Sequence, residues 1–204
     1  MTCKIKLIKN DEFLTSKWSG GTTTEIAIYP KDSLYSERNF IWRLSSAKVK
    51  TEESTFTSLP GINRIIMILK GKLKLEHIGH HKCILGPFEQ DSFSGSWETK
   101  SYGQVTDFNL MMNEKCNGKL EPIFIKKGEE KKFILKVNEE YQKSTQAIYC
   151  IFGEAKIHTS TNEILNLHEG DAVLLTVSNS AQLDFTVYND ISNVSRLVKA
   201  DIMY

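Results

Sequence analysis

The chain has 204 residues, of which 40% are apolar and 25% are charged, an ordinary balance for a globular protein that excludes large-scale disorder. The net charge is +1 and the lysines are interspersed with acids, so there is no basic stripe for nucleic-acid phosphates. No apolar run is long enough to span a bilayer, and the N-terminus lacks the apolar segment of a signal peptide, so we expect a cytoplasmic protein with no membrane partner.

Strand signals dominate the chain from end to end. Short runs rich in β-branched and aromatic residues alternate with Gly, Pro, Asn, Asp and Ser, which is typical of a sandwich or barrel. The predicted strands cover residues 5–8, 23–29, 40–49, 64–75, 105–112, 122–127, 132–137, 147–158, 172–177 and 182–188. One short helix is expected around residues 32–36, and helix content should be low.

Two stretches of the chain resemble each other weakly. Gly71 and Gly153 each follow a mainly apolar run and open an alternating strand, and each is followed by a turn that leads to another apolar strand. Two unrelated hairpins could agree by coincidence, because hairpins share turn chemistry. The repeated unit resembles the cupin barrel. Two copies imply an all-β bicupin, a tandem pair of double-stranded β-helix barrels of the RmlC-like jelly-roll type.

We therefore predict two domains. Residues 1–118 would form a cupin barrel with a ligand pocket, and residues 119–204 a second barrel with a structural role. Cupins that bind metal resemble the pattern G-x5-H-x-H-x3/4-E-x6-G, in which Arg64 and Gln146 here take the carboxylate position. No histidine precedes Gly71, and a cation at that position would repel a divalent metal, so we expect neither a metal nor another cofactor.

The segment His77-Ile-Gly-His80-His81 is the rival candidate for a metal site. Residues three apart on a strand face opposite sides, and the glycine is typical of a hairpin tip. We interpret these histidines as exposed turn residues. The four cysteines form no CxxC pair, and Cys83 and Cys150 fall inside apolar runs, so buried free thiols are expected there.

Polar residues recur on one face of several predicted strands in the first half. Arg43 and Ser45 share a face, as do Thr23 and Glu25, and as do Asp107, Asn109 and Met111. If these faces point inward, Arg43 and Arg64 could simply pair with Glu25 and Asp107. Alternatively, one guanidinium keeps its donors free for the carboxylate of a ligand, which its fork fits.

Glycines and tryptophans accompany these strands. Gly20 and Gly21 could let backbone amides approach a ligand, but a simple turn is the favoured interpretation. Trp18 and Trp42 could line a pocket, although large aromatic residues in a β-barrel usually belong to the core.

These clusters, taken in order, resemble the HutD/Ves family. The family pattern looks like W-x-G-G-x-T-x-E-I, F-x-W-R-x-S-x-A, F-x-x-x-P-G-x-x-R, F-x-G-D and D-F-N-x-M. The matching residues here are Trp18, Gly20, Gly21, Thr23, Glu25, Ile26, Phe40, Trp42, Arg43, Ser45, Ala47, Phe56, Pro60, Gly61, Arg64, Phe93, Gly95, Asp107, Phe108, Asn109 and Met111. Ser19 and Ser96 depart from the family's usual asparagine and aspartate, which puts ligand specificity in doubt.

The resemblance implies a bicupin, often dimeric, that is associated with histidine utilisation and proposed to bind formylated or formiminated glutamate. The predicted ligand-binding residues are Trp18, Gly20, Gly21, Thr23, Glu25, Arg43, Ser45, Arg64, Phe93, Asp107, Asn109 and Met111.

Three functions remain open at this point. The first is a non-catalytic, regulatory protein that binds a small acidic metabolite and forms a homodimer. The second is a metal-free isomerase, lyase or hydrolase that uses Asp107 or Glu25 as base; it is disfavoured because a carboxylate beside two arginines should have a lowered pKa. The third is a dimerisation protein with a purely structural polar interior.

Overall fold

The computed structural model describes residues 2–204 and is built almost entirely of β-strands. It contains nineteen strands, and its only helical elements within those residues are two 3-10 turns, Asn10–Glu12 and Tyr35–Glu37. The expected all-β class with low helix content is therefore confirmed. No helix in this part of the chain is long and apolar enough to cross a membrane. The helix expected around residues 32–36 is replaced by the second 3-10 turn.

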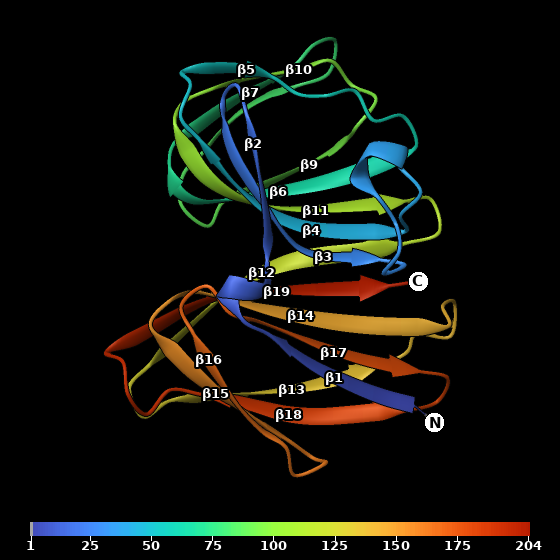
Figure 1. Ribbon diagram of the computed structural model, residues 1–204, viewed down its shortest axis with the longest axis vertical. Coiled ribbons are helices and arrows are strands. Elements are labelled where there is room, and N and C mark those ends of the chain that lie inside the picture. The colour runs from blue at the N-terminus through green and yellow to red at the C-terminus, as the bar shows by residue number, and fades with distance from the viewer. Residues whose placement is uncertain (1) are drawn as a thin grey trace. The chain divides into compact units, whose positions relative to one another are not determined.

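The chain divides into two compact units (Figure 1). The central unit is Phe13–Cys116, and the terminal unit combines residues 2–12 with Asn117–Tyr204. The sequence had suggested that residues 1–118 fold together. Instead, β1 (Thr2–Ile8) pairs along its length with β17 (Ala172–Ser178), so the first strand belongs with the C-terminal half.

The central unit has two antiparallel sheets. Its six-stranded sheet has the order β2-β3-β4-β11-β6-β9, and its four-stranded sheet the order β5-β10-β7-β8. The strands of the larger sheet are β2 (Leu14–Trp18), β3 (Gly21–Tyr29), β4 (Trp42–Val49), β11 (Val105–Asn113), β6 (Ile62–Gly71) and β9 (Gln90–Ser94). Those of the smaller sheet are β5 (Glu53–Thr55), β10 (Thr99–Tyr102), β7 (Leu73–His77) and β8 (Lys82–Leu85).

The terminal unit also has two antiparallel sheets. Their strand orders are β1-β17-β14-β19-β12 and β13-β18-β15-β16. Besides β1 and β17, the first sheet contains β14 (Lys143–Phe152), β19 (Val194–Met203) and β12 (Asn117–Lys126). The second contains β13 (Glu130–Lys136), β18 (Gln182–Tyr188), β15 (Glu154–Thr159) and β16 (Ile164–His168).

A glycine breaks each long apolar run into two strands. The predicted strand 64–75 becomes β6 and β7, which belong to different sheets, and Gly71 between them has a φ of +92°. The predicted strand 147–158 likewise becomes β14 and β15 around Gly153, whose φ is +78°. Glycine adopts positive φ without steric cost, so these two residues let the chain leave one sheet and enter the other.

Each unit has its own apolar core. In the central unit, residues of β6, β7 and β9 that alternate along their strands pack together, with Ile66, Ile68, Leu75 and Phe93 among them. The terminal unit has a larger core, which is drawn from both of its sheets. Because side chains alternate between the two faces of a strand, a polar residue two positions from a core residue also points inward.

Candidate functional site

Arg64 lies on the inward face of β6. Ile66 and Ile68, which share that face, belong to the apolar core of the central unit. Strand β11 lies between β4 and β6, and its Met111 is paired with Arg43 on one side and with Arg64 on the other. The two arginines therefore flank the methionine in one row across the sheet.

Further polar residues occupy the neighbouring rows. Glu25 and Asn109 both pair with Ser45, one from each side of β4. Thr23 and Asp107 lie in the row after that, again on either side of β4. The register thus gathers residues from three separate predicted clusters on one inward face.

Arg43 has partners within the protein. Its Nε donates to Oε2 of Glu25 at 2.7 Å, and one terminal nitrogen donates to Oγ of Ser45 at 3.1 Å. Its guanidinium carbon also lies 4.5 Å above the centre of the Tyr35 ring. Of the two alternatives that the sequence left open, the structure shows for Arg43 an ion pair within the protein.

Arg64 is different. It is only 7% exposed, and its guanidinium carbon lies 4.6 Å and 5.2 Å from the ring centres of Phe56 and Phe93. Within residues 2–204 it forms no ion pair, and its buried Nε has no hydrogen-bond partner. Burial lowers the pKa of Arg64 to about 10, so the side chain remains a cation at neutral pH.

Two acceptor oxygens nearby are also without partners. Oδ1 of Asp107 and Oδ1 of Asn109 are buried, and neither has a hydrogen-bond donor in the described chain. Burial raises the pKa of Asp107 to about 7, and this outweighs the opposing effects of Arg64 and of the backbone amide of Ala47. The expectation that this pKa would be lowered was wrong, because Arg43 is engaged elsewhere and desolvation dominates.

Three expected site residues, Trp18, Gly20 and Gly21, lie at the tip of the β2–β3 hairpin. Trp18 is 39% exposed, and its indole nitrogen donates to Oγ1 of Thr23 at 3.2 Å. A Cβ on Gly20 would lie 2.0 Å from the Trp18 ring, and one on Gly21 would lie 2.0 Å from the carbonyl oxygen of Lys48. Gly21 is therefore needed for close packing against the backbone of β4, whereas Gly20 lies under the exposed Trp18 ring, in keeping with the simple turn that the sequence favoured.

Two aromatic residues complete the cluster. Tyr35 and Phe56 cover Arg43 and Arg64 respectively, and neither was among the predicted ligand-binding residues. Phe56 belongs to the sequence motif F-x-x-x-P-G-x-x-R that ends at Arg64, so the sequence contained a signal for its place near that arginine. Tyr35 lies in a 3-10 turn whose position over the sheet no local pattern indicates.

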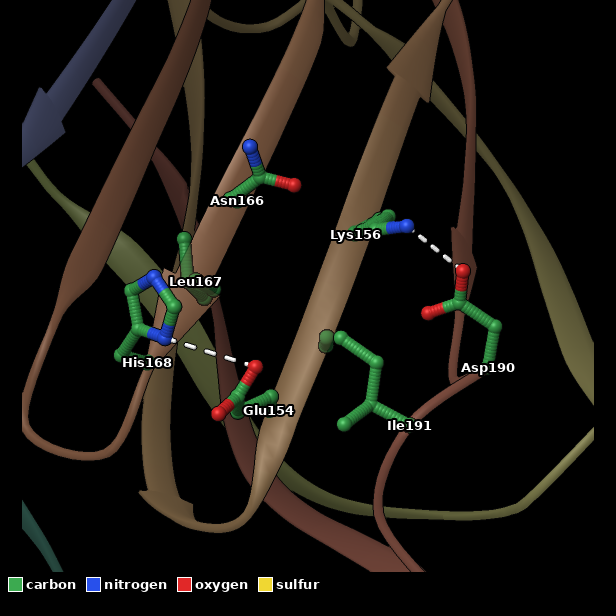
Figure 2. Close-up of a pocket in the computed structure, with 8 residues that line it drawn as sticks. Glu154, Lys156, Asn166, Leu167, His168, Asp190 and Ile191 are labelled. Atoms are coloured by element: carbon green, nitrogen blue, oxygen red, sulfur yellow. Dashed lines mark hydrogen bonds and ion pairs between the residues drawn. The ribbon is translucent and has the colours of Figure 1, made fainter.

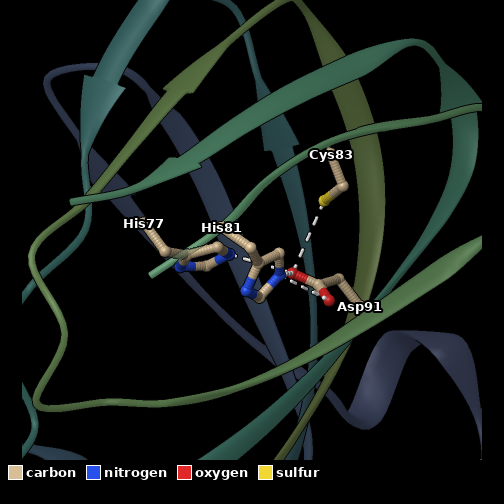
Figure 3. A group of neighbouring side chains, drawn as sticks. All are labelled: His77, His81, Cys83 and Asp91. Carbon is tan, nitrogen blue, oxygen red and sulfur yellow. Dashed lines mark hydrogen bonds and ion pairs between the residues drawn. The ribbon is translucent and has the colours of Figure 1, made fainter. Parts of the chain in front are cut away.

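The histidine segment differs from its prediction. His77 is 2% exposed at the end of β7, and it lies near His81, Cys83 and Asp91 (Figure 3). Its interpretation as an exposed turn residue was wrong, whereas His80 and His81 are exposed. Residues three apart do face opposite sides, but the turn brings His81, four residues on, back beside His77.

A surface pocket of about 210 Å³ lies on the terminal unit (Figure 2). Its polar side chains contact one another, Lys156 and Asp190 as an ion pair at 2.5 Å and His168 beside Glu154 at 3.5 Å. Since these side chains already have partners at the surface, the pocket is a weaker ligand site than the surroundings of Arg64.

The sequence model of the HutD family matches residues 10–192. The chain belongs to the HutD family. No curated protein sequence matches it significantly.

Solved structures support the same fold. A conserved protein of unknown function from Pseudomonas aeruginosa PAO1 is 20% identical with a TM-score of 0.83, and the alignment covers 98% of this chain and 100% of that one. HutD from Pseudomonas fluorescens SBW25 is 23% identical with a TM-score of 0.71 and 98% coverage of both chains. Oxalate decarboxylase from Lactobacillus farciminis, at 8% identity and a TM-score of 0.69, covers 96% of this chain and 85% of its own. The likeness to this enzyme supports the cupin-like fold alone.

Proposed function

We propose that the central unit of this HutD-family protein binds a small acidic metabolite, a formylated or formiminated glutamate being the favoured class, and that it acts as a regulatory protein in histidine utilisation. The observation that carries this proposal is Arg64, a buried cation with no carboxylate within 4.0 Å in the described chain; the charge of Asp107 acts on it only from a longer distance. A buried charge is costly unless it is paired, so an anionic ligand would supply the missing partner.

The surroundings of Arg64 suit a carboxylate. Its planar guanidinium can donate two parallel hydrogen bonds, and the rings of Phe56 and Phe93 pack against it. Asp107, whose pKa is about 7, can be neutral near physiological pH and donate a hydrogen bond to the same anion. The Asn109 Oδ1 atom can accept from an N–H group such as that of a formamide.

Formate occurs with two of the structural neighbours, once as a condition and once as a bound ligand. HutD from Pseudomonas fluorescens was solved in a formate condition, and the Lactobacillus farciminis oxalate decarboxylase as a formate complex. Formate is the smallest carboxylate, so it is a sensible first probe for Arg64. We also retain the homodimer as a prediction.

We further propose that the two units are a repeated pair of cupin barrels. The strand order β4-β11-β6-β9 corresponds to β12-β19-β14-β17. Met111 is paired with Arg64 in one unit, and Asp201 with Gln146 in the other. This correspondence equates Arg64 with Gln146, as the alignment of the two apolar runs predicts.

A ligand-binding assay with matched variants tests the binding proposal. Thermal shift and calorimetry would be run with formate, glutamate, formylglutamate, formiminoglutamate and an unrelated dicarboxylate. At a hundred times its dissociation constant, a true ligand adds about 2.7 kcal/mol to the free energy of unfolding, which is visible as several degrees. We expect a selective shift with one glutamate derivative that disappears in Arg64→Ala.

Two variants serve as controls for that assay. Arg64→Lys keeps a positive charge but loses the planar fork, so it should bind the acid more weakly than the wild type. Arg196→Ala removes an exposed arginine that also lies over an aromatic ring, Phe152, and should leave binding unchanged. Equal affinity in Arg64→Ala and the wild type would contradict the proposal.

A metal-free enzyme is the second candidate, and one observation favours it. A pKa near 7 makes Asp107 suited to donate or accept a proton at neutral pH, whereas Glu25 is held by Arg43. Turnover of a formylated amino acid that is lost in Asp107→Asn, with binding retained, would promote this candidate over simple binding. The purely structural alternative has less support, since Arg64 is not satisfied by any protein carboxylate within residues 2–204.

A further inference from the structure

Four potential metal ligands converge at one edge of the central unit. His77 ends β7, His81 closes the turn after it, Cys83 lies on β8 and Asp91 lies on β9. Figure 3 shows the histidine and cysteine side chains directed at the carboxylate of Asp91. Strands β7 and β8 belong to the four-stranded sheet and β9 to the six-stranded sheet, so the cluster bridges the two sheets.

The distances are close to those of a tetrahedral site. The four ligand atoms all lie within 4.8 Å of one another. Oδ2 of Asp91 is 2.9 Å from Nε2 of His77, 3.0 Å from Nε2 of His81 and 3.5 Å from Sγ of Cys83. In a tetrahedral zinc site adjacent ligand atoms are roughly 3.3–3.8 Å apart, so the short contacts would have to open and the widest one to close, by up to about 1 Å, to admit an ion.

The ligands are also held in orientation. Nδ1 of His77 lies 2.8 Å from Oγ1 of Thr99, a contact that leaves Nε2 directed at the cluster. The His77 ring packs 4.5 Å from the centre of Phe93 and 5.6 Å from that of Trp97. The side chain of His77 is 0% exposed and that of His81 is 41% exposed, so the cluster is fixed on its inner side and open to an entering ion on its outer side.

We propose that His77, His81, Cys83 and Asp91 form a structural site for a divalent transition metal, with Zn²⁺ as the favoured ion. Two imidazoles, a thiolate and a carboxylate are the donors that zinc takes in tetrahedral sites, and four protein ligands leave no open position for catalysis. The argument against a metal at Arg64 does not extend here, because this cluster lies on other strands. Without an ion, the same atoms would form only a hydrogen-bonded group around Asp91.

Metal binding by the purified, reduced full-length protein tests the proposal. After chelator treatment and dialysis, Zn²⁺ would be added by isothermal titration, and Co²⁺ would be added while the absorption spectrum is recorded. We expect saturable uptake of about one ion per chain, intense tetrahedral Co²⁺ bands and a thiolate-to-cobalt charge-transfer band. Zinc should also raise the melting temperature.

Variants identify the ligands. Cys83→Ser should lose the charge-transfer band, and His81→Gln should weaken zinc binding by at least about tenfold, as should Thr99→Val through the orientation of His77. His80→Gln and Cys3→Ser are the matched controls, because His80 stacks on Trp97 outside the ligand group and Cys3 lies on β1. Both should retain full binding.

Two outcomes would overturn the site. Absence of saturable Zn²⁺ uptake by the folded wild type would leave a hydrogen-bonded cluster only. Undiminished uptake by the folded double variant His81→Gln, Cys83→Ser would place any metal elsewhere. Circular dichroism of each variant establishes that it is folded, and none of these readouts depends on whether Arg64 binds an acid.

Discussion

Arg43 and Arg64 show how a neighbouring residue decides the role of a side chain. Both are buried arginines on inward faces of the same sheet, and both lie over aromatic rings. Arg43 has Glu25 within 2.7 Å, whereas Arg64 has no carboxylate partner within residues 2–204. The first therefore stabilises the fold, and the second pays a desolvation cost that suits a binding site.

Arg64→Met should stabilise the ligand-free protein. Methionine has a similar length and no charge, so the substitution removes a buried unpaired cation, and we expect a gain of about 1–3 kcal/mol in the free energy of unfolding. Urea denaturation without ligand measures it. Arg43→Met is the control and should destabilise, because it leaves Glu25 without its partner; a loss of stability in Arg64→Met as well would mean that Arg64 is structural.

Asp107 should make stability fall with rising pH. The unfolded chain releases this proton near pH 3.8, while the ligand-free fold retains it until about pH 7. Between these values the unfolded state is favoured by up to about 1.4 kcal/mol per pH unit, and the effect is complete above pH 7. We would measure the unfolding free energy of the wild type minus that of Asp107→Asn across this range, which cancels the contributions of other groups.

The unfolding free energy of the wild type minus that of Asp107→Asn should decline from about pH 4 to pH 7 and then level off. A flat difference would show that the pKa of Asp107 is not raised. The affinity for an acidic ligand should also fall above pH 7, because ionised Asp107 repels an anion and can no longer donate a hydrogen bond to it.

At the scale of elements, the β2–β3 hairpin depends on close backbone approach. Gly21 begins β3 at the point where the strand lies against Lys48 of β4, and a side chain there has no space. The hairpin carries Thr23 and Glu25 into the rows beside Ser45 and Asp107, so its position matters for the polar face as a whole.

Gly21→Ala should destabilise the protein by about 1–3 kcal/mol, because the new methyl group would overlap the carbonyl oxygen of Lys48. Gly86→Ala is the matched control: a Cβ there meets only the Glu89 carboxylate, at 3.4 Å, so the change should be small. Chemical denaturation of the two variants measures both. Equal stability of Gly21→Ala and the wild type would indicate that the hairpin can shift without cost.

The terminal unit also contains a buried cation on an inward strand face, but this cation has carboxylate partners. Lys199, which is 5% exposed, lies 3.1 Å from both Glu121 and Asp201, and Asp201 accepts from Gln146 at 2.7 Å. In the terminal unit the buried cation therefore has carboxylate partners, although the Oε1 atom of Gln146 is buried without a partner within the described residues. The mainly structural role of the second unit stays a prediction.

At the scale of the whole molecule, the chain begins in the unit where it also ends. Besides the pairing of β1 with β17, Nζ of Lys9 lies 2.8 Å from Oδ2 of Asp171, and the backbone nitrogen of Asn10 donates to Oδ1 at 3.0 Å. The first strand covers what would otherwise be an open sheet edge.

Deletion of residues 2–9 should therefore weaken the terminal unit selectively. Hydrogen exchange should become faster in β17, which loses its pairing partner, and remain slow in β11 of the central unit. Mass spectrometry of peptides from the two strands measures this difference. If exchange in β17 is unaffected, the pairing of β1 contributes little to stability in solution.

The sequence alone determined the class and the family. Alternation of apolar residues, turn signals and the ordered motifs were enough to predict an all-β, cupin-like protein of the HutD family, because these signals are local. They also placed Arg43, Ser45 and Asp107 on strand faces that do point inward. The sequence could also predict that these polar residues share one face of their strands, since side chains alternate between the two faces.

Only the tertiary structure revealed the features that depend on how strands far apart in the sequence pair with one another. It assigned Glu25 to Arg43 and left Arg64 unpaired, and it raised the pKa of Asp107 through burial. Strand β19, which lies between β14 and β12, was not predicted, nor was the return of β1 to the terminal unit. The approach of His77 to Asp91 likewise requires two sheets to meet. Each of these results depends on which strands pair and on how much water the fold excludes, and neither is encoded in a local pattern.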